Sequence, residues 1–131
     1  MSIRKLLSLF FVVGLLAIGI SKASAMSFEE AFNQSGKKPM LVLMYANWAD
    51  NYQNYLNAFK VLEQTYGESF NFVELNIASE DARFFNDRYH IYPKLPYILM
   101  YRDSGKVSRY IQRECVLNDS CVNARVKSFI Q

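Results

Sequence analysis

The sequence has few of the residues from which metal sites and nucleophilic centres are built. It contains two cysteines and one histidine, His90. Two sulfurs and one distant histidine do not make up the four ligands of a structural zinc site. A lone histidine also gives little support for acid–base catalysis. We therefore expect no metal and no cofactor, and we interpret His90 as a structural residue.

The sequence also lacks an excess of charge once its first 25 residues are set aside. The formal net charge of the whole chain is +3, but Arg4, Lys5 and Lys22 all lie in that first stretch. Subtracting them from the 15 basic residues leaves 12, which equals the number of acidic residues. Nucleic acids and anionic lipids attract proteins through a surplus of positive charge. We therefore expect neither as a partner.

A long apolar run occurs only at the amino-terminal end. Two basic residues precede the run from Leu6 to Ile20, and Ala23-Ser24-Ala25 follows it. This order predicts a secretory signal peptide of residues 1–25, cleaved after Ala25. The run is shorter than the roughly 20 residues of a spanning helix, although an uncleaved anchor is the alternative. We expect export, to the periplasm if the source is bacterial and otherwise to the secretory or extracellular space, with no stable membrane insertion after cleavage.

Residues 26–131 are predicted to form one domain. They contain no internal repeat, low-complexity tract or linker, which leaves room for a single core. Strands joined by a helix pair in parallel, whereas a short turn at 103–106 requires an antiparallel pair. The expected fold class is α/β, with a central mixed four-stranded sheet flanked by helices. The apolar periodicity predicts helices at 28–36, 52–66, 79–90 and 119–129, and strands at 40–45, 70–75, 97–101 and 107–111.

A short motif after the first predicted strand resembles one from a known family. Tyr45-Ala46-Asn47-Trp48 stands between that strand and a helix, and Leu95-Pro96 stands just before another apolar strand. With the order of helices and strands over nearly all of residues 26–131, these features resemble a thioredoxin-fold domain. The sequence Tyr45-Ala46-Asn47-Trp48 is most similar to the Tyr-Ala-Asp-Trp-Cys motif of periplasmic thiol-reductase domains. The resemblance therefore implies a thioredoxin-like domain.

The catalytic pair of that family is missing. Redox-active members carry Cys-X-X-Cys directly after the tryptophan, where this chain has Ala49, Asp50, Asn51 and Tyr52. Thiol–disulfide exchange needs an attacking thiolate and a resolving thiol, and neither alanine nor tyrosine supplies one. The buried acid that assists many thioredoxins aligns with Leu43, and Asp50 is better explained as a helix cap than as a general acid. We expect no catalytic residue here.

The resemblance also implies a surface for a partner. Thioredoxin-like domains place a cis-proline beside the start of the motif-bearing helix, so we expect a cis Leu95-Pro96 bond. Trp48, Tyr52, Tyr92, Leu95 and Pro96 would then share one exposed apolar patch, which suits a protein or peptide. The alternative is that the tyrosines pack in the core or at its rim and that Trp48 packs under its loop.

The two cysteines lie elsewhere, at Cys115 and Cys121. An oxidising compartment favours a disulfide between residues so close, and two buried free thiols are the alternative. The default interpretation is a structural link from the hairpin to the last helix. The other interpretation is an exchangeable pair, for which Arg113 would favour a thiolate and Glu114 would oppose it.

The leading functional hypothesis is a non-catalytic protein- or peptide-binding or assembly module, whose partner is another exported protein or peptide. The alternative is an unconventional thiol–disulfide oxidoreductase that uses Cys115 and Cys121. A third hypothesis keeps the fold as a scaffold within a larger envelope or secretion complex, with the important surface on other helix faces.

Overall fold

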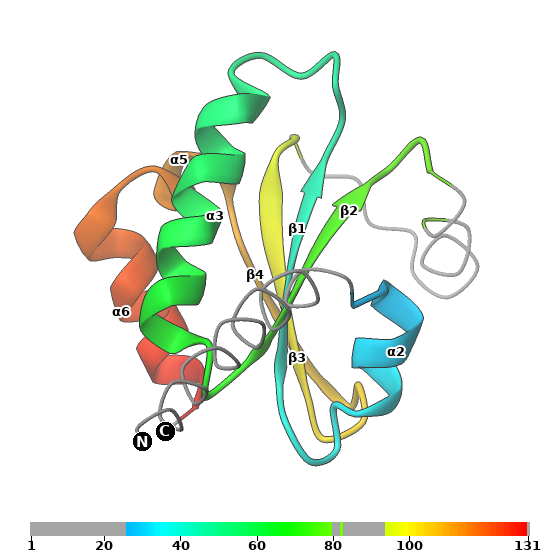
Figure 1. Ribbon diagram of the computed structural model, residues 1–131. Coiled ribbons are helices and arrows are strands. Elements are labelled where there is room, and N and C mark those ends of the chain that lie inside the picture. Colours follow the sequence, from blue (N-terminus) through cyan, green and yellow to red (C-terminus); the bar gives the residue numbers. More distant parts are fainter. Residues whose placement is uncertain (1–25, 80–81, 83–93, 131) are drawn as a thin grey trace, which may run out of the picture.

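Figure 1 shows the computed structural model, which describes residues 26–79, 82 and 94–130. The predicted signal peptide lies outside these residues, as do Tyr92, His90 and most of the helix predicted at 79–90. None of the described helices is long and apolar enough to cross a membrane.

The described elements follow the predicted order, with one addition. The additional element is a four-residue helix, α5, between the last strand and the last helix. In chain order the elements are α2 (Phe28–Asn33), β1 (Met40–Tyr45), α3 (Tyr52–Tyr66), β2 (Asn71–Asn76), β3 (Tyr97–Arg102), β4 (Val107–Ile111), α5 (Arg113–Val116) and α6 (Asp119–Phe129).

The strands form one mixed sheet in the order β2-β1-β3-β4. β1 pairs with β2 in parallel and with β3 antiparallel, and β3 pairs with β4 antiparallel. The parallel pair is joined through α3, and the hairpin between β3 and β4 turns through Asp103, Ser104 and Gly105, all at positive φ. The predicted mixed four-stranded sheet is therefore confirmed.

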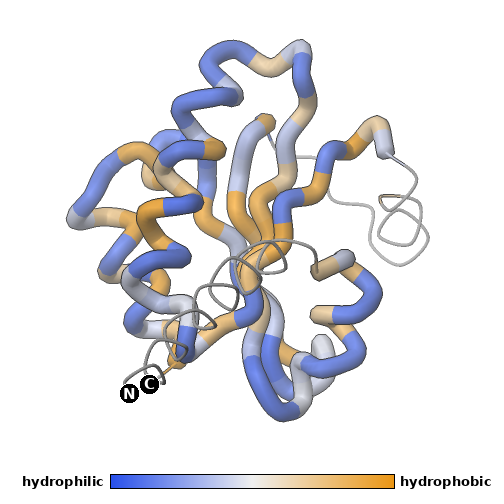
Figure 2. The backbone as a smooth tube through the Cα atoms, in the orientation of Figure 1, coloured by the Kyte–Doolittle hydropathy of each residue, from blue (hydrophilic) through white to orange (hydrophobic). Residues whose placement is uncertain are grey.

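Helices cover both faces of the sheet, with α3 and α6 on one side and α2 on the other (Figure 1). The α3–α6 side buries a cluster that includes Leu41, Phe59 and Val126. The α2 side buries a second cluster that includes Val42 and Phe28. Side chains of β1 contribute to both clusters, which is why its sequence is apolar along its whole length. Figure 2 shows the apolar centre of the sheet and the hydrophilic turns around it.

Capping hydrogen bonds and a glycine set the ends of the helices. α2 begins at a capping box, in which the Ser27 hydroxyl accepts from the Glu30 N–H at 3.1 Å and the Glu30 carboxylate accepts from the Ser27 N–H at 3.3 Å. α2 ends at Asn33, three residues before the predicted end, because the chain turns at Gln34. α3 stops at Gly67 as predicted, where an added Cβ would lie 2.7 Å from the Glu63 carbonyl oxygen.

Candidate functional site

The motif singled out in the sequence lies at one edge of the sheet. Met44, near the carboxyl end of β1, pairs with Tyr97, the first residue of β3. The loop after β1 and the Leu95-Pro96 segment before β3 therefore meet at the same end of these strands, which is the upper end in Figure 1. We call this region, formed by residues 45–52, 76–77 and 95–96, the motif edge.

The loop of the motif edge is fixed by hydrogen bonds. The Ile77 N–H donates to the Tyr45 carbonyl at 2.9 Å, and the Asn76 side-chain amide donates to the Asn47 side-chain oxygen at 3.2 Å. Inside the loop, the Ala49 N–H donates to the carbonyl of the fully buried Ala46 at 3.0 Å. The loop is therefore attached to β2 as well as to β1.

The helix start itself differs from the expectation. Asp50 is exposed and does not cap α3, so that interpretation is wrong. The N-cap is Asn51, which has a left-handed backbone (φ 60°) and no side-chain capping bond. Asparagine tolerates this conformation better than most residues, and the left-handed turn moves the helix start one residue past Asp50.

Trp48 points into solvent from this loop. Its exposed fraction is 67%, the highest among the large apolar side chains that the structure describes. The alternative that it packs under its own loop is therefore wrong. Because the loop is fixed and the indole is exposed, the side chain contributes to a surface and not to the core.

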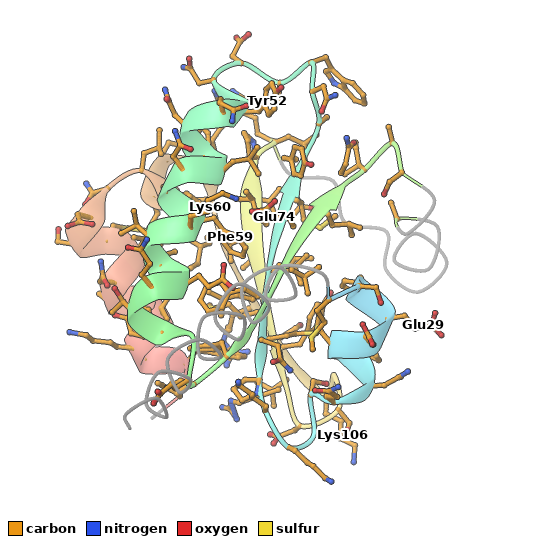
Figure 3. All side chains as sticks on the ribbon, in the orientation of Figure 1. Glu29, Tyr52, Phe59, Lys60, Glu74 and Lys106 are labelled. Atoms are coloured by element: carbon orange, nitrogen blue, oxygen red, sulfur yellow. A yellow bond between two sulfur atoms is a disulfide. The ribbon has the colours of Figure 1, made fainter. Side chains whose placement is uncertain are left out.

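Tyr52 occupies the position of the second cysteine of the family motif and stacks on Tyr45. Their ring centroids are 6.0 Å apart and the planes differ by 5°. Figure 3 shows Tyr52 at the start of α3, above the ion pair between Lys60 and Glu74, whose charged atoms are 3.2 Å apart. Sequence periodicity could not reveal this stack, because the two rings lie on different elements.

Burial, and then the negative charge of Glu74, raise the pKa of Tyr45 above its ordinary value, with a further contribution from Tyr52. Lys60 acts in the opposite direction. The Tyr45 hydroxyl therefore stays protonated at neutral pH, where it can donate a hydrogen bond but does not act as a nucleophile.

The proline segment contributes less exposed surface than the sequence suggested. The Leu95-Pro96 bond is cis, the isomer that the resemblance implies. Pro96, however, is buried, and Leu95 is half-buried against the α2-side cluster. Tyr92 lies outside the described residues. The exposed apolar area of the described motif edge is therefore dominated by Trp48, with a share from Tyr52.

The predicted disulfide between Cys115 and Cys121 is confirmed, with an S–S distance of 2.05 Å and Cα atoms 5.4 Å apart. It joins α5 to α6, and Cys115 is only 3% exposed within the α3–α6 cluster. The nearby Arg113 donates from Nε to the Tyr55 hydroxyl at 3.3 Å, and its guanidinium lies over that ring. Cys121, the other partner, is half-buried.

The motif edge holds no dithiol and no substitute for one. Leu43, at the position of the family's assisting acid, is fully buried in the apolar α3–α6 cluster. Among the described residues, no three histidine, cysteine, aspartate or glutamate side chains lie close enough to hold a metal ion. What this edge offers is an exposed indole, a stacked tyrosine pair and backbone groups beside a cis-proline.

Comparison with known proteins identifies the fold through solved structures and not through sequence. No protein-family model and no curated protein matches the sequence. The Trx4 domain of ERdj5 superposes with a TM-score of 0.60 at 16% identity, over 83% of this chain and 96% of that domain. Oxidised thioredoxin from Plasmodium falciparum gives 0.61 at 15%, over 78% and 88%. Thioredoxin f2 from Chlamydomonas reinhardtii gives 0.61 at 17%, also over 78% and 88%.

This chain has the thioredoxin fold. At 17% identity or less, these three structures establish the fold and nothing about activity. Within this thioredoxin fold, Ala49 and Tyr52 stand at the two positions where the redox-active form of the motif has cysteines. The one disulfide described lies outside the motif, between α5 and α6.

Proposed function

We propose that this protein is an exported, non-catalytic module that binds an extended segment of another protein at the motif edge. The observation that carries the proposal is the exposure of Trp48, at 67%, on a loop held by hydrogen bonds at both strands. An exposed indole on a fixed loop costs little further ordering when a partner covers it.

The chemistry of the patch defines the partner. Tryptophan and tyrosine bury large areas with few rotatable bonds, and they dominate the binding energy of many protein interfaces. The Tyr45–Tyr52 stack is half-buried and belongs to the same motif edge as Trp48. The segment that fits therefore carries at least one aromatic or large aliphatic side chain to cover the indole.

The absence of a thiol from the motif favours binding over exchange. A catalytic dithiol must release its partner through a second attack, whereas Ala49 and Tyr52 form no covalent bond with it. For the exchangeable-pair alternative, burial of Cys115 disfavours exchange at that sulfur, whereas Cys121 is half-buried.

The binding proposal is tested with Trp48, the only tryptophan of the chain. Peptides selected from a displayed library against the purified protein are titrated in, and the Trp48 fluorescence is followed. We expect a blue shift on binding, because the indole leaves water. Trp48→Ala, followed by calorimetry, is expected to weaken binding by about tenfold or more, the range of a hot-spot residue.

The matched control is Val61→Ala, which removes an apolar side chain that is 56% exposed elsewhere on α3. Its affinity is expected to equal that of the wild type. If every selected peptide binds Trp48→Ala as tightly as it binds the wild type, the motif edge is not the binding surface and the proposal fails.

Export is tested by the intact mass of the protein recovered from cells. We expect a chain that begins at Met26 and carries two fewer hydrogens than the reduced form, because the leader is cleaved after Ala25 and the cysteines are joined. A chain that retains residues 1–25 and sediments with membranes would instead establish the anchor alternative.

A further inference from the structure

Three arginines from three different elements line one pocket. They are Arg102 at the end of β3, Arg109 on β4 and Arg125 on α6, and the pocket has a volume of about 290 Å³. Its remaining lining residues are Met100, Tyr110, Ser128 and Phe129. Pro96 immediately precedes the first residue of β3 and Arg102 is its last, so the pocket lies at the opposite end of that strand from the motif edge.

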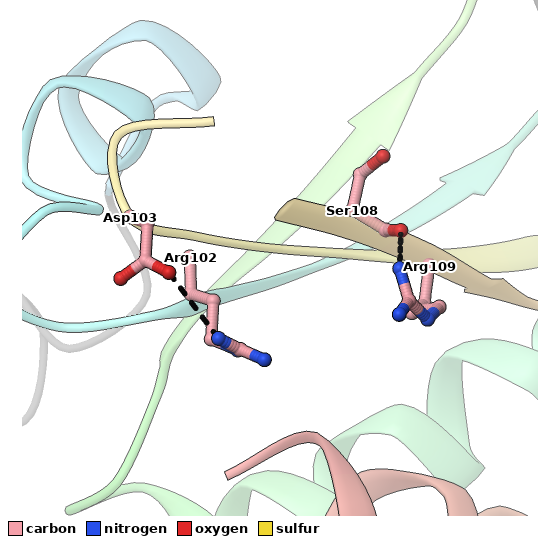
Figure 4. Close-up of polar contacts among 4 residues, drawn as sticks. All are labelled: Arg102, Asp103, Ser108 and Arg109. Carbon is pink, nitrogen blue, oxygen red and sulfur yellow. Dashed lines mark hydrogen bonds and ion pairs between the residues drawn. The ribbon is translucent and has the colours of Figure 1, made fainter. Parts of the chain in front are cut away.

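The fold explains why these side chains meet. Arg109 pairs with Met100 across the hairpin, and Arg102 follows Met100 by two residues, so all three side chains lie on one face of the sheet. Met100 and Val126 belong to the same cluster, which identifies this face as the one that packs on α6. In Figure 4 the Arg102 and Arg109 side chains extend from neighbouring strands to the same side.

The positive charge of this pocket is only partly balanced. The Asp103 carboxylate binds the Arg102 Nη1 at 3.2 Å, but the Arg102 Nε is buried and has no hydrogen-bond partner. Arg109 donates from Nη1 to the Ser108 carbonyl oxygen at 2.8 Å. Among the described residues that line the pocket, none carries a carboxylate. A buried donor without an acceptor destabilises the protein, and arginines without an acidic partner in the pocket lining attract an anion.

We propose that this pocket binds a phosphate group, either as inorganic phosphate or on a small phosphomonoester. The guanidinium fork matches the oxygens of phosphate, and arginines from three elements line this one pocket. A phosphate carries up to two negative charges near neutral pH, whereas a carboxylate carries one and has only two oxygens. Phe129 borders the pocket, with the Arg102 guanidinium carbon 5.1 Å from its ring centroid, and provides an apolar surface for the organic part of an ester.

The test is calorimetric titration of the purified protein with inorganic phosphate, phenyl phosphate and acetate at constant ionic strength. We expect saturable binding of a phosphate compound, with acetate weaker by about tenfold or more. The double variant Arg109→Gln/Arg125→Gln is expected to bind phosphate about tenfold or more weakly, because it lacks two of the three guanidinium groups. Both side chains are exposed, and an unchanged melting temperature verifies the fold.

The matched control pair is Lys106→Gln with Lys127→Gln, which removes two positive charges from residues outside the pocket lining. This pair is expected to bind phosphate as the wild type does. Tighter binding of phenyl phosphate would identify an ester as the ligand class, and tighter binding of inorganic phosphate would identify the free ion. Equal weakening in both pairs, equal binding of acetate, or no saturation below about 10 mM would overturn the proposal.

Discussion

Replacing Cys115 and Cys121 together by alanine is expected to lower the free energy of unfolding by about 2 to 4 kcal/mol. Insulin-disulfide reduction is expected to stay at the background rate both in this variant and in the wild type. The loop that the disulfide closes is short, with a sequence separation of 6, so the entropic part of the effect is near the lower end of that range. Loss of the buried Cys115 sulfur adds a packing contribution.

The position of the disulfide explains why stability and not redox activity should change. The bond holds α5, which is only four residues long, against the amino end of α6. A one-turn helix is marginal in isolation, so the covalent link and the burial of Cys115 and Val116 keep it in place. Burial of the Cys115 sulfur limits the access of an external thiol or disulfide to it.

Urea unfolding followed by circular dichroism measures the stability change, and the turbidity of reduced insulin measures the redox activity. Either single replacement breaks the same link and is expected to cost about as much as the pair. Equal stability of all forms would show that the disulfide contributes nothing to the fold. Insulin reduction by the wild type alone would show that Cys115 and Cys121 are a relocated redox centre, and the functional proposal would then be wrong.

β1 and α3 show what the sequence pattern predicts well. Residues 40–44 are apolar without interruption, a pattern typical of a short strand covered on both faces. In α3, apolar side chains recur at steps of three and four, and the structure buries Tyr55, Phe59 and Leu62 among them. Both elements have the predicted bounds, because each signal repeats along the whole element.

Short and irregular segments carry no such repeated signal. α5 is a single turn, too short for a helical period, and the sequence did not predict it. The start of α3 depends on the left-handed backbone of Asn51, which follows from how the loop is held between two strands and not from the preference for aspartate as a cap. Tertiary contacts decide both features.

The sequence predicts which residues form the motif edge, but it does not predict which of their side chains are exposed. The missing cysteines are a matter of which residues are present, so the sequence alone shows the loss of the motif. Whether Trp48 points outward and Pro96 inward depends on packing, which no spacing rule encodes. The arginine pocket joins residues from β3, β4 and α6 that share no motif, so only the sheet register brings them together.

Phe59→Ala is expected to lower the free energy of unfolding by about 3 to 5 kcal/mol, the largest effect of a single replacement that we predict. Phe59 is 1% exposed in the middle of α3, and its ring centroid lies 5.2 Å from that of Phe72 on β2. Truncation removes the apolar ring from the α3–α6 cluster and leaves a cavity between helix and sheet. A domain of this size has only about 5 to 15 kcal/mol of stability in total.

Urea unfolding measures the loss, and Val61→Ala, on the exposed side of the same helix, is the matched control. That control is expected to change the free energy of unfolding by no more than about 0.5 kcal/mol. The folded Phe59→Ala protein, below its unfolding transition, is expected to keep the fluorescence maximum of the wild type, because Trp48 is fixed by its loop and not by this part of the core. A loss below about 1 kcal/mol would mean that the cluster closes around the cavity and that α3 is not anchored through Phe59.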